Sequence, residues 1–176
     1  TTIGGHALDA PEFREFWGEA HRRHLPVLVH PTFPIGGPSN DRGEYLAVGY
    51  LSETAMAATK LALGGVLEEC PDVRIVWSHC GGSLCMVLDR VDRGYRRYEK
   101  CLRPPSEYLR QCWYDTATLS GPALECARTT FGPRRLVYGT DEPHVPNASR
   151  AVLATLRARP WLEGDLEGVL GGNAHG

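Results

Sequence analysis

Four short apolar segments of this chain each end at a polar residue, and this repeat constrains the fold more than any other feature. The run VRIVW stops at SHCGG, so that His79 follows a strand pattern and precedes two glycines. The same arrangement recurs where VLV ends at His30, WY at Asp115 and LVYGT at Asp141. Short apolar runs bounded in this way are typical of buried strands. We therefore expect four strands with polar side chains at their C-terminal ends, as on the active-site face of a parallel α/β protein.

Helical patterns separate the four expected strands. The strands are expected at 27–29, 73–77, 113–116 and 136–140, the first of them buried on both faces. The helices are expected at about 10–24, 52–70, 84–98, 107–111, 121–131, 147–158 and 163–170. Asp9 and Glu12 form a capping-box pattern for the first helix, and Ser52 is a candidate cap for the second. The alternation of helices and strands implies right-handed βαβ units and a parallel sheet.

Two segments fall outside this alternation. Residues 1–8 are a glycine-rich lead-in that we interpret as the end of a strand and its loop. Residues 31–50 form a long stretch that is rich in Pro and Gly. Loops of this length in a compact domain are usually functional or disordered. We expect this loop to form a lid over the strand ends.

The composition indicates the class of partner. The 176 residues are 42% apolar and 23% charged and carry a net charge of -2, so we expect one domain with its own core and no membrane span. The near-neutral charge gives no electrostatic basis for binding nucleic acid. The six cysteines form no CxxC pair, which favours reduced thiols and a cytoplasmic location. A small molecule is therefore the expected partner.

Three residues at the expected strand ends are the strongest site candidates. His30 is held extended by Pro31 and could bind a metal or be a hydrogen-bonded loop residue. His79 could be a metal ligand, a general acid/base or a cap of the next helix. Asp141 could be an oxygen ligand or an N-cap. Because all three are expected at the same edge of one sheet, their coincidence favours a functional site.

Two further residues have weaker signals. Arg90 lies on the helix behind His79 and could bind a substrate carboxylate through two hydrogen bonds, or form a surface ion pair with Asp89 or Asp92. Asp115 could orient a neighbouring side chain or only cap a loop. Neither residue alone predicts a function.

A resemblance to a known family is carried by five segments, in this order: VLVHP, ETAMAATKLALGGVLEECPDVRIVWSHCGG, WYDTAT, RRLVYGTDEP and GGNA. They resemble the amidohydrolase-2 family of metal-dependent hydrolases. Within that family the chain is most similar to the aminocarboxymuconate-semialdehyde decarboxylase group, which includes resorcylate-type decarboxylases. The resemblance covers nearly the whole chain, and it implies a (β/α)8 TIM barrel with one catalytic metal, usually zinc.

The resemblance also implies roles for single residues. His30 and Asp141 would bind the metal, Zn2+ or another divalent ion, from the fifth and eighth strands. His79, at the end of the sixth strand, would be the acid/base that activates water at the metal. Arg90 matches an arginine that some members extend across a dimer interface to hold the substrate carboxylate, so a homodimer is expected. Asp115 would lie on the seventh strand.

One part of the family pattern has no counterpart here. No His-x-His or Glu-x-His pair lies on a strand expected before His30. A complete barrel of this kind takes about 250 residues. We therefore expect residues 1–176 to form a single partial domain, the C-terminal half of a TIM barrel with strands five to eight. Such a half would have unpaired strand edges and an exposed core face.

The resemblance leads to an expected activity for the parent enzyme. We expect metal-dependent, non-oxidative decarboxylation of a small unsaturated or aromatic carboxylate. One alternative is a metal-dependent hydrolase that opens a lactone or an amide at the same site. The other is a non-catalytic half-barrel that serves as a binding module.

Overall fold

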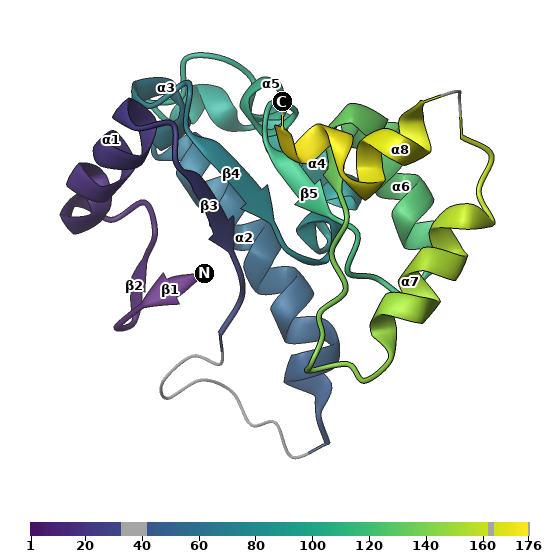
Figure 1. Cartoon of the computed structure of the whole chain (residues 1–176). Helices are drawn as coiled ribbons and strands as arrows, with labels where there is room; N and C mark the ends of the chain where they lie inside the picture. The colour runs from purple at the N-terminus through teal and green to yellow at the C-terminus, as the bar shows by residue number, and fades with distance from the viewer. Residues whose placement is uncertain (33–41, 162–163, 176) are drawn as a thin grey trace.

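A four-stranded parallel sheet lies at the centre of the computed structural model, which describes residues 1–32, 42–161 and 164–175 (Figure 1). The strands follow one another in the order β3 (Pro26–Val29), β4 (Arg74–Trp77), β5 (Trp113–Asp115) and β6 (Leu136–Val137). Each neighbouring pair is parallel. The expected α/β fold is therefore confirmed, and the C-terminal ends of all four strands meet at one edge of the sheet.

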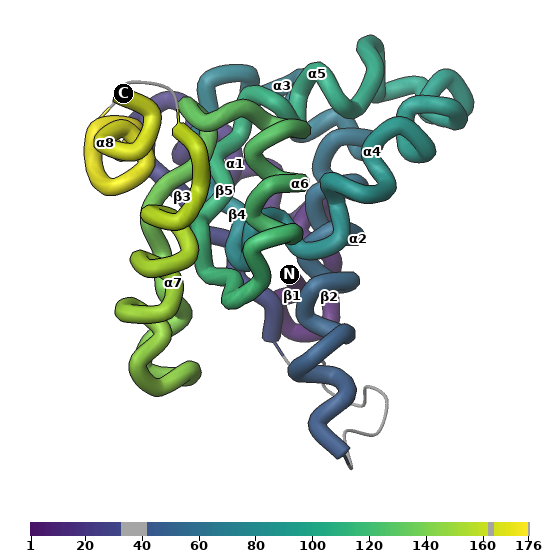
Figure 2. The backbone as a smooth tube through the Cα atoms, turned by 90° about the vertical axis from the view of Figure 1, so that its right-hand side faces the viewer, coloured from purple at the N-terminus to yellow at the C-terminus, as the bar shows by residue number. Residues whose placement is uncertain are grey.

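Helices connect the strands and flank the sheet. Their bounds are α1 (Arg14–Arg22), α2 (Tyr50–Leu63), α3 (Val66–Glu69), α4 (Leu84–Asp92), α5 (Pro105–Leu109), α6 (Gly121–Phe131), α7 (Ala148–Arg157) and α8 (Asp165–Leu170). A short π-helix, Tyr45–Gly49, leads directly into α2. Figures 1 and 2 show α2 and α4 as a layer on the far side of the sheet, with α1 beside β3. The helices α7 and α8 lie at the opposite end of the molecule from α1.

The covered face of the sheet carries the core. The strand register aligns Val29 with Trp77, Trp77 with Tyr114, and Tyr114 with Leu136. All four side chains are buried. The ring of Tyr114 also stacks on Phe131 of α6, with the ring centroids 3.7 Å apart. This packing holds the strand ends against the helices and so fixes the positions of the residues that follow them.

The opposite face of the sheet is open over β3. Leu28 of β3 is 63% exposed, whereas the next residue, Val29, is buried, and Figure 1 shows no described helix in front of β3. The expectation that this strand is buried on both faces was therefore wrong. Within the described residues β3 and β6 are the edge strands of the sheet. An uncovered apolar face and two open edges are what half of a barrel presents.

Three local expectations were wrong. The turn that begins the first helix follows Ala10 rather than Asp9, and it has no side-chain cap. Ser52 lies inside α2, where its hydroxyl donates to a carbonyl of the preceding turn at 3.1 Å. The helix expected at 52–70 is interrupted at Gly65, whose φ of 83° is a conformation that glycine adopts without strain.

The N-terminal lead-in forms a small hairpin of β1 (Thr2–Ile3) and β2 (His6–Ala7) instead of the end of a sheet strand. The loop expected to form a lid lies mostly outside the described residues. All six cysteines are free thiols. Among the described helices, none has the length and apolar character needed to cross a membrane.

Candidate metal centre

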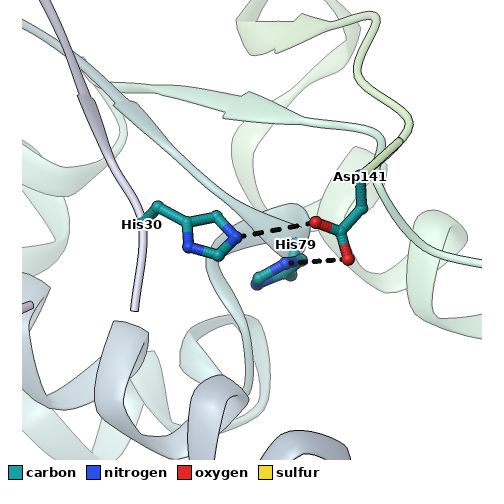
Figure 3. A group of neighbouring side chains, drawn as sticks. All are labelled: His30, His79 and Asp141. Atoms are coloured by element: carbon teal, nitrogen blue, oxygen red, sulfur yellow. Dashed lines mark ion pairs between the residues drawn. The ribbon is translucent and has the colours of Figure 1, made fainter. Parts of the chain in front are cut away.

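Three side chains from separate strand ends converge at one edge of the sheet (Figure 3). His30 follows β3, His79 follows β4 after one residue, and Asp141 lies beyond β6. Nε2 of His30 is 3.6 Å from Oδ1 of Asp141, and Nε2 of His79 is 3.7 Å from Oδ2. One ligand-type atom of each residue lies within 4.8 Å of the other two. The structure thus brings together the three residues that the sequence singled out.

Hydrogen bonds fix the position of His30. Its carbonyl accepts a hydrogen bond from the backbone nitrogen of Thr1 at 3.0 Å, and its Nδ1 lies 2.7 Å from the carbonyl oxygen of Pro31. Because a carbonyl only accepts, Nδ1 carries a hydrogen, and Nε2 is the nitrogen that faces Asp141. Metal-binding histidines commonly have such a hydrogen bond on their second nitrogen.

His79 lies in a turn of four residues with positive φ. The φ values are 54° at His79, 56° at Cys80, 77° at Gly81 and 62° at Gly82. A Cβ at Gly82 would lie 2.1 Å from the carbonyl oxygen of Leu51, so only glycine fits there. Positive φ at the two residues with side chains is costly and persists only where the surroundings hold it. The surroundings of this turn therefore determine where the imidazole points.

Asp141 also has a left-handed backbone, with a φ of 63°. Its carbonyl accepts a hydrogen bond from the N–H of Val145 at 3.0 Å. Its carboxylate faces both histidines (Figure 3). The exposed fraction of the side chain is 10% for His79, 23% for Asp141 and 39% for His30. The site is therefore most open on the side of His30.

The surroundings keep His79 neutral near pH 7. Burial of the imidazole lowers its pKa below the usual value, and this is the largest effect. The Asp141 carboxylate raises this pKa, and His30 lowers it. A neutral imidazole can bind a metal or accept a proton.

The three side chains fit a divalent cation. Imidazole nitrogens and carboxylate oxygens are usual ligands of zinc and similar ions. Two ligand atoms that lie about 2.1 Å from one tetrahedral ion are about 3.4 Å apart. The histidine nitrogens lie at comparable distances of 3.6 and 3.7 Å from the Asp141 oxygens. These distances are longer than those of good hydrogen bonds, so the carboxylate faces both histidines at ion-pair distance.

Asp115 contacts the turn that carries His79. Its Oδ1 accepts hydrogen bonds from the N–H groups of Ala117, at 3.0 Å, and Cys80, at 3.4 Å. Desolvation raises the pKa of this carboxyl from 3.8 to about 6, and the backbone N–H groups around it oppose that rise. Of the two roles that the sequence allowed, these contacts favour the orientation of a neighbour.

Arg90 lies apart from the three converging side chains. It is exposed on α4, where it lines a pocket together with Thr59 and Leu63 of α2. This pocket lies between two helices rather than at the strand ends. A contact between Arg90 and substrate stays a prediction.

The family model described as Amidohydrolase, Amidohydro_2, matches residues 2–175. The chain belongs to the amidohydrolase-2 family. It is also 27% identical to the 2-amino-3-carboxymuconate-6-semialdehyde decarboxylase of Dictyostelium discoideum, over 99% of this chain and 50% of that protein.

Solved structures share the fold of this amidohydrolase-2 chain. The 2,6-dihydroxybenzoate decarboxylase complexed with 2,6-dihydroxybenzoate aligns with a TM-score of 0.81 and 25% identity, over 97% of this chain and 56% of that one. A dihydroxybenzoic acid decarboxylase from Polaromonas sp. JS666, with bound manganese and an inhibitor, aligns with a TM-score of 0.81 and 22% identity, over 97% of this chain and 54% of that one. The chain therefore spans about half the length of the relatives that it matches.

Sequence reasoning missed two residues near the site. The ring of Tyr50 lies edge-on to that of His30, with centroids 6.2 Å apart. This contact depends on how α2 packs, so no local signal could have indicated it. The hydroxyl of Thr116 bonds to Gly139, near Asp141. Thr116 directly follows Asp115 at the end of a strand, and this position could have indicated that it lies near the site.

Proposed function

We propose that this chain supplies part of the active site of a metal-dependent, non-oxidative decarboxylase that acts on a small unsaturated or aromatic carboxylate. The observation that carries the proposal is the convergence of His30, His79 and Asp141 at the strand ends, in a chain of the amidohydrolase-2 family. The names of several relatives point to the same reaction on muconate-type and dihydroxybenzoate substrates. Those relatives are about twice as long as this chain, so the proposal concerns the natural polypeptide that carries this sequence.

In this proposal His30 and Asp141 hold the ion. Nδ1 of His30 is bonded to the carbonyl of Pro31, which leaves Nε2 as the nitrogen for the ion, and Asp141 offers a carboxylate oxygen 3.6 Å away from it. When bound, a divalent ion such as Zn2+ supplies Lewis-acid stabilisation of negative charge on the substrate. The mixed nitrogen and oxygen ligands suit zinc and manganese alike.

His79 transfers the proton. Non-oxidative decarboxylation replaces the bond between carbon and the carboxylate with a C–H bond, so a proton must reach that carbon as carbon dioxide leaves. The imidazole of His79 is the most buried of the three side chains. Its Nδ1 has no hydrogen-bond partner among the described residues, unlike that of His30. An imidazole without this anchor can hold its proton on Nδ1, so Nε2 of the neutral ring can accept a proton from water and then deliver that proton to the carbon, which returns the ring to its neutral form.

In this proposal Arg90 binds the carboxylate of a substrate that is held in the active site of a second subunit. Its exposed position on the helix layer lies away from the strand ends of its own chain. The resemblance to family members that extend this arginine across a dimer interface is the reason why we propose a homodimer. Arginine suits this role because its planar group binds a carboxylate through two parallel hydrogen bonds.

The experiment compares two reactions of the natural polypeptide that carries this sequence. The protein is loaded with Zn2+ or Mn2+ and incubated with a panel of aromatic and unsaturated carboxylates and, separately, with lactones. We expect carbon dioxide release from at least one carboxylate, lost in His79→Asn and kept in His175→Asn. Lactone opening without carbon dioxide release would establish a hydrolase instead. Failure to bind either metal would refute a metal-dependent activity and favour a non-catalytic binding module.

A further inference from the structure

Thr116, directly after β5, is bonded to the strand end that leads to Asp141. Its side chain is buried, with 1% exposure. Its hydroxyl accepts a hydrogen bond from the N–H of Gly139 at 3.1 Å and donates one to the carbonyl of the same residue at 3.2 Å. One side chain thus satisfies both backbone groups of Gly139, two positions before Asp141.

Asp115 precedes Thr116 in sequence and contacts the segment that follows β4, on the other side of β5. Its carboxylate accepts the N–H of Cys80 at 3.4 Å, the residue that follows His79 in the positive-φ turn. It also packs closely against Gly139, where a Cβ would lie 2.8 Å from the Cβ of Asp115. The end of β5 therefore contacts the segments that carry two of the three converging side chains.

We propose that Asp115 and Thr116 are positioning residues that set the separation between His79 and Asp141. The backbones of His79 and Asp141 both have positive φ, at 54° and 63°, and such conformations need support from neighbouring groups. The two residues supply that support through hydrogen bonds to backbone groups, while their own side chains remain outside the converging set. They keep Nε2 of His79 at 3.7 Å from Oδ2 of Asp141.

The proposal deepens the proposed function, since it concerns the same site, but one of its two tests is independent of metal and catalysis. Four variants of the natural polypeptide that carries this sequence separate the effect of hydrogen bonding from the effect of size. Asp115→Leu and Thr116→Val remove the hydrogen-bonding groups and keep the number of side-chain heavy atoms. Asp115→Asn keeps a carbonyl acceptor, and Thr116→Ser keeps the hydroxyl. Asp89→Leu and Thr155→Val are matched controls on α4 and α7.

The metal-free test uses nuclear magnetic resonance. In the unaltered chain the rings of His30 and His79 lie with centroids 4.9 Å apart, so proton contacts between these rings should be detected. We expect Asp115→Leu to shift the amide resonance of Cys80 and to weaken the ring contacts. We expect Thr116→Val to shift the resonances of Asp141. The Asn and Ser variants should restore the original spectra, which a loss of general stability would not explain.

The metal test is a calorimetric titration with Mn2+ alone. Loss of groups that orient metal ligands typically weakens metal binding by about 10-fold to 100-fold, and we expect Asp115→Leu and Thr116→Val to fall in this range. The Asn, Ser and control variants should stay within about 3-fold of the unaltered chain. If Asp115→Leu does not fold, the comparison of Thr116→Val with Thr116→Ser decides whether the positioning role holds.

The two tests separate this proposal from the proposed function. Binding of Mn2+ that is unchanged in Asp115→Leu and Thr116→Val, with unchanged spectra around His79 and Asp141, overturns the positioning role and leaves the metal site intact. No Mn2+ binding by the unaltered chain counts against the metal site. The spectra then decide the positioning role alone.

Discussion

Replacing Asp115 with asparagine is expected to change how the stability of the chain depends on pH. Desolvation raises the pKa of this carboxyl from 3.8 to about 6. Between these two values the folded chain binds a proton that the unfolded chain has released, so stability falls as pH rises through this range. Above about pH 6 the folded chain carries an ionised carboxylate in a poorly hydrated place. Asparagine has a similar shape and does not ionise, so its contribution is independent of pH.

The size of the effect follows from the pKa. A shift from 3.8 to about 6 corresponds to at most about 3 kcal/mol, because one pKa unit equals about 1.4 kcal/mol. Asp115 is partly exposed to solvent, so water reduces the change in unfolding free energy below this limit. The quantity to compare is the free energy of unfolding of Asp115→Asn minus that of the unaltered chain. We expect this difference to rise by about 1–3 kcal/mol between pH 4 and pH 7.

The assay is urea unfolding followed by circular dichroism between pH 4 and pH 7.5, with EDTA present so that no metal contributes. Asp89→Asn, at an exposed position on α4, is the matched control and should show no such trend. The reasoning is refuted if the difference between Asp115→Asn and the unaltered chain is constant with pH, or if it falls as pH rises.

Two further predictions concern the packing behind the site. Gly82→Ala should lower the free energy of unfolding by about 2–4 kcal/mol, because φ at this position is +62° and a Cβ would lie 2.1 Å from the carbonyl oxygen of Leu51. The control Gly94→Ala should change it by less than about 0.5 kcal/mol, because a Cβ there has no atom within 4 Å. Equal effects in the two variants, measured by urea unfolding, would contradict the described turn. Leu61→Ala, at 0% exposure, should cost about 2–5 kcal/mol, whereas Met86→Ala, at 81% exposure, should cost less than about 0.5 kcal/mol. A small loss in Leu61→Ala would show that this part of the core is not packed as described.

The positions of the strands were predictable because each strand is a short apolar run that ends at a polar residue. The convergence of His30, His79 and Asp141 followed from that pattern, since parallel strands present their C-terminal ends at one edge. The roles of these residues were available only through the family resemblance. Spacing alone cannot distinguish a metal ligand from an acid/base.

Other features depend on contacts that are distant in sequence. The run around Leu28 looked fully buried, yet its exposure depends on what covers the second face of the sheet. The cap expected at Asp9 was wrong because the chain enters its first helix one residue later, through Ala10. The bonds from Thr116 to Gly139 span 23 positions, and no local pattern predicts which backbone groups a buried hydroxyl will meet.

The most direct test of the central claim is to locate a bound ion on the natural polypeptide that carries this sequence. Substoichiometric Mn2+, which broadens nearby resonances, is added to a labelled sample. The account predicts that broadening begins at His30, His79 and Asp141, and that His30→Ala removes it. Broadening that is centred on His6 and His21 and leaves the strand-end residues sharp would contradict the claim that these three residues form a metal site.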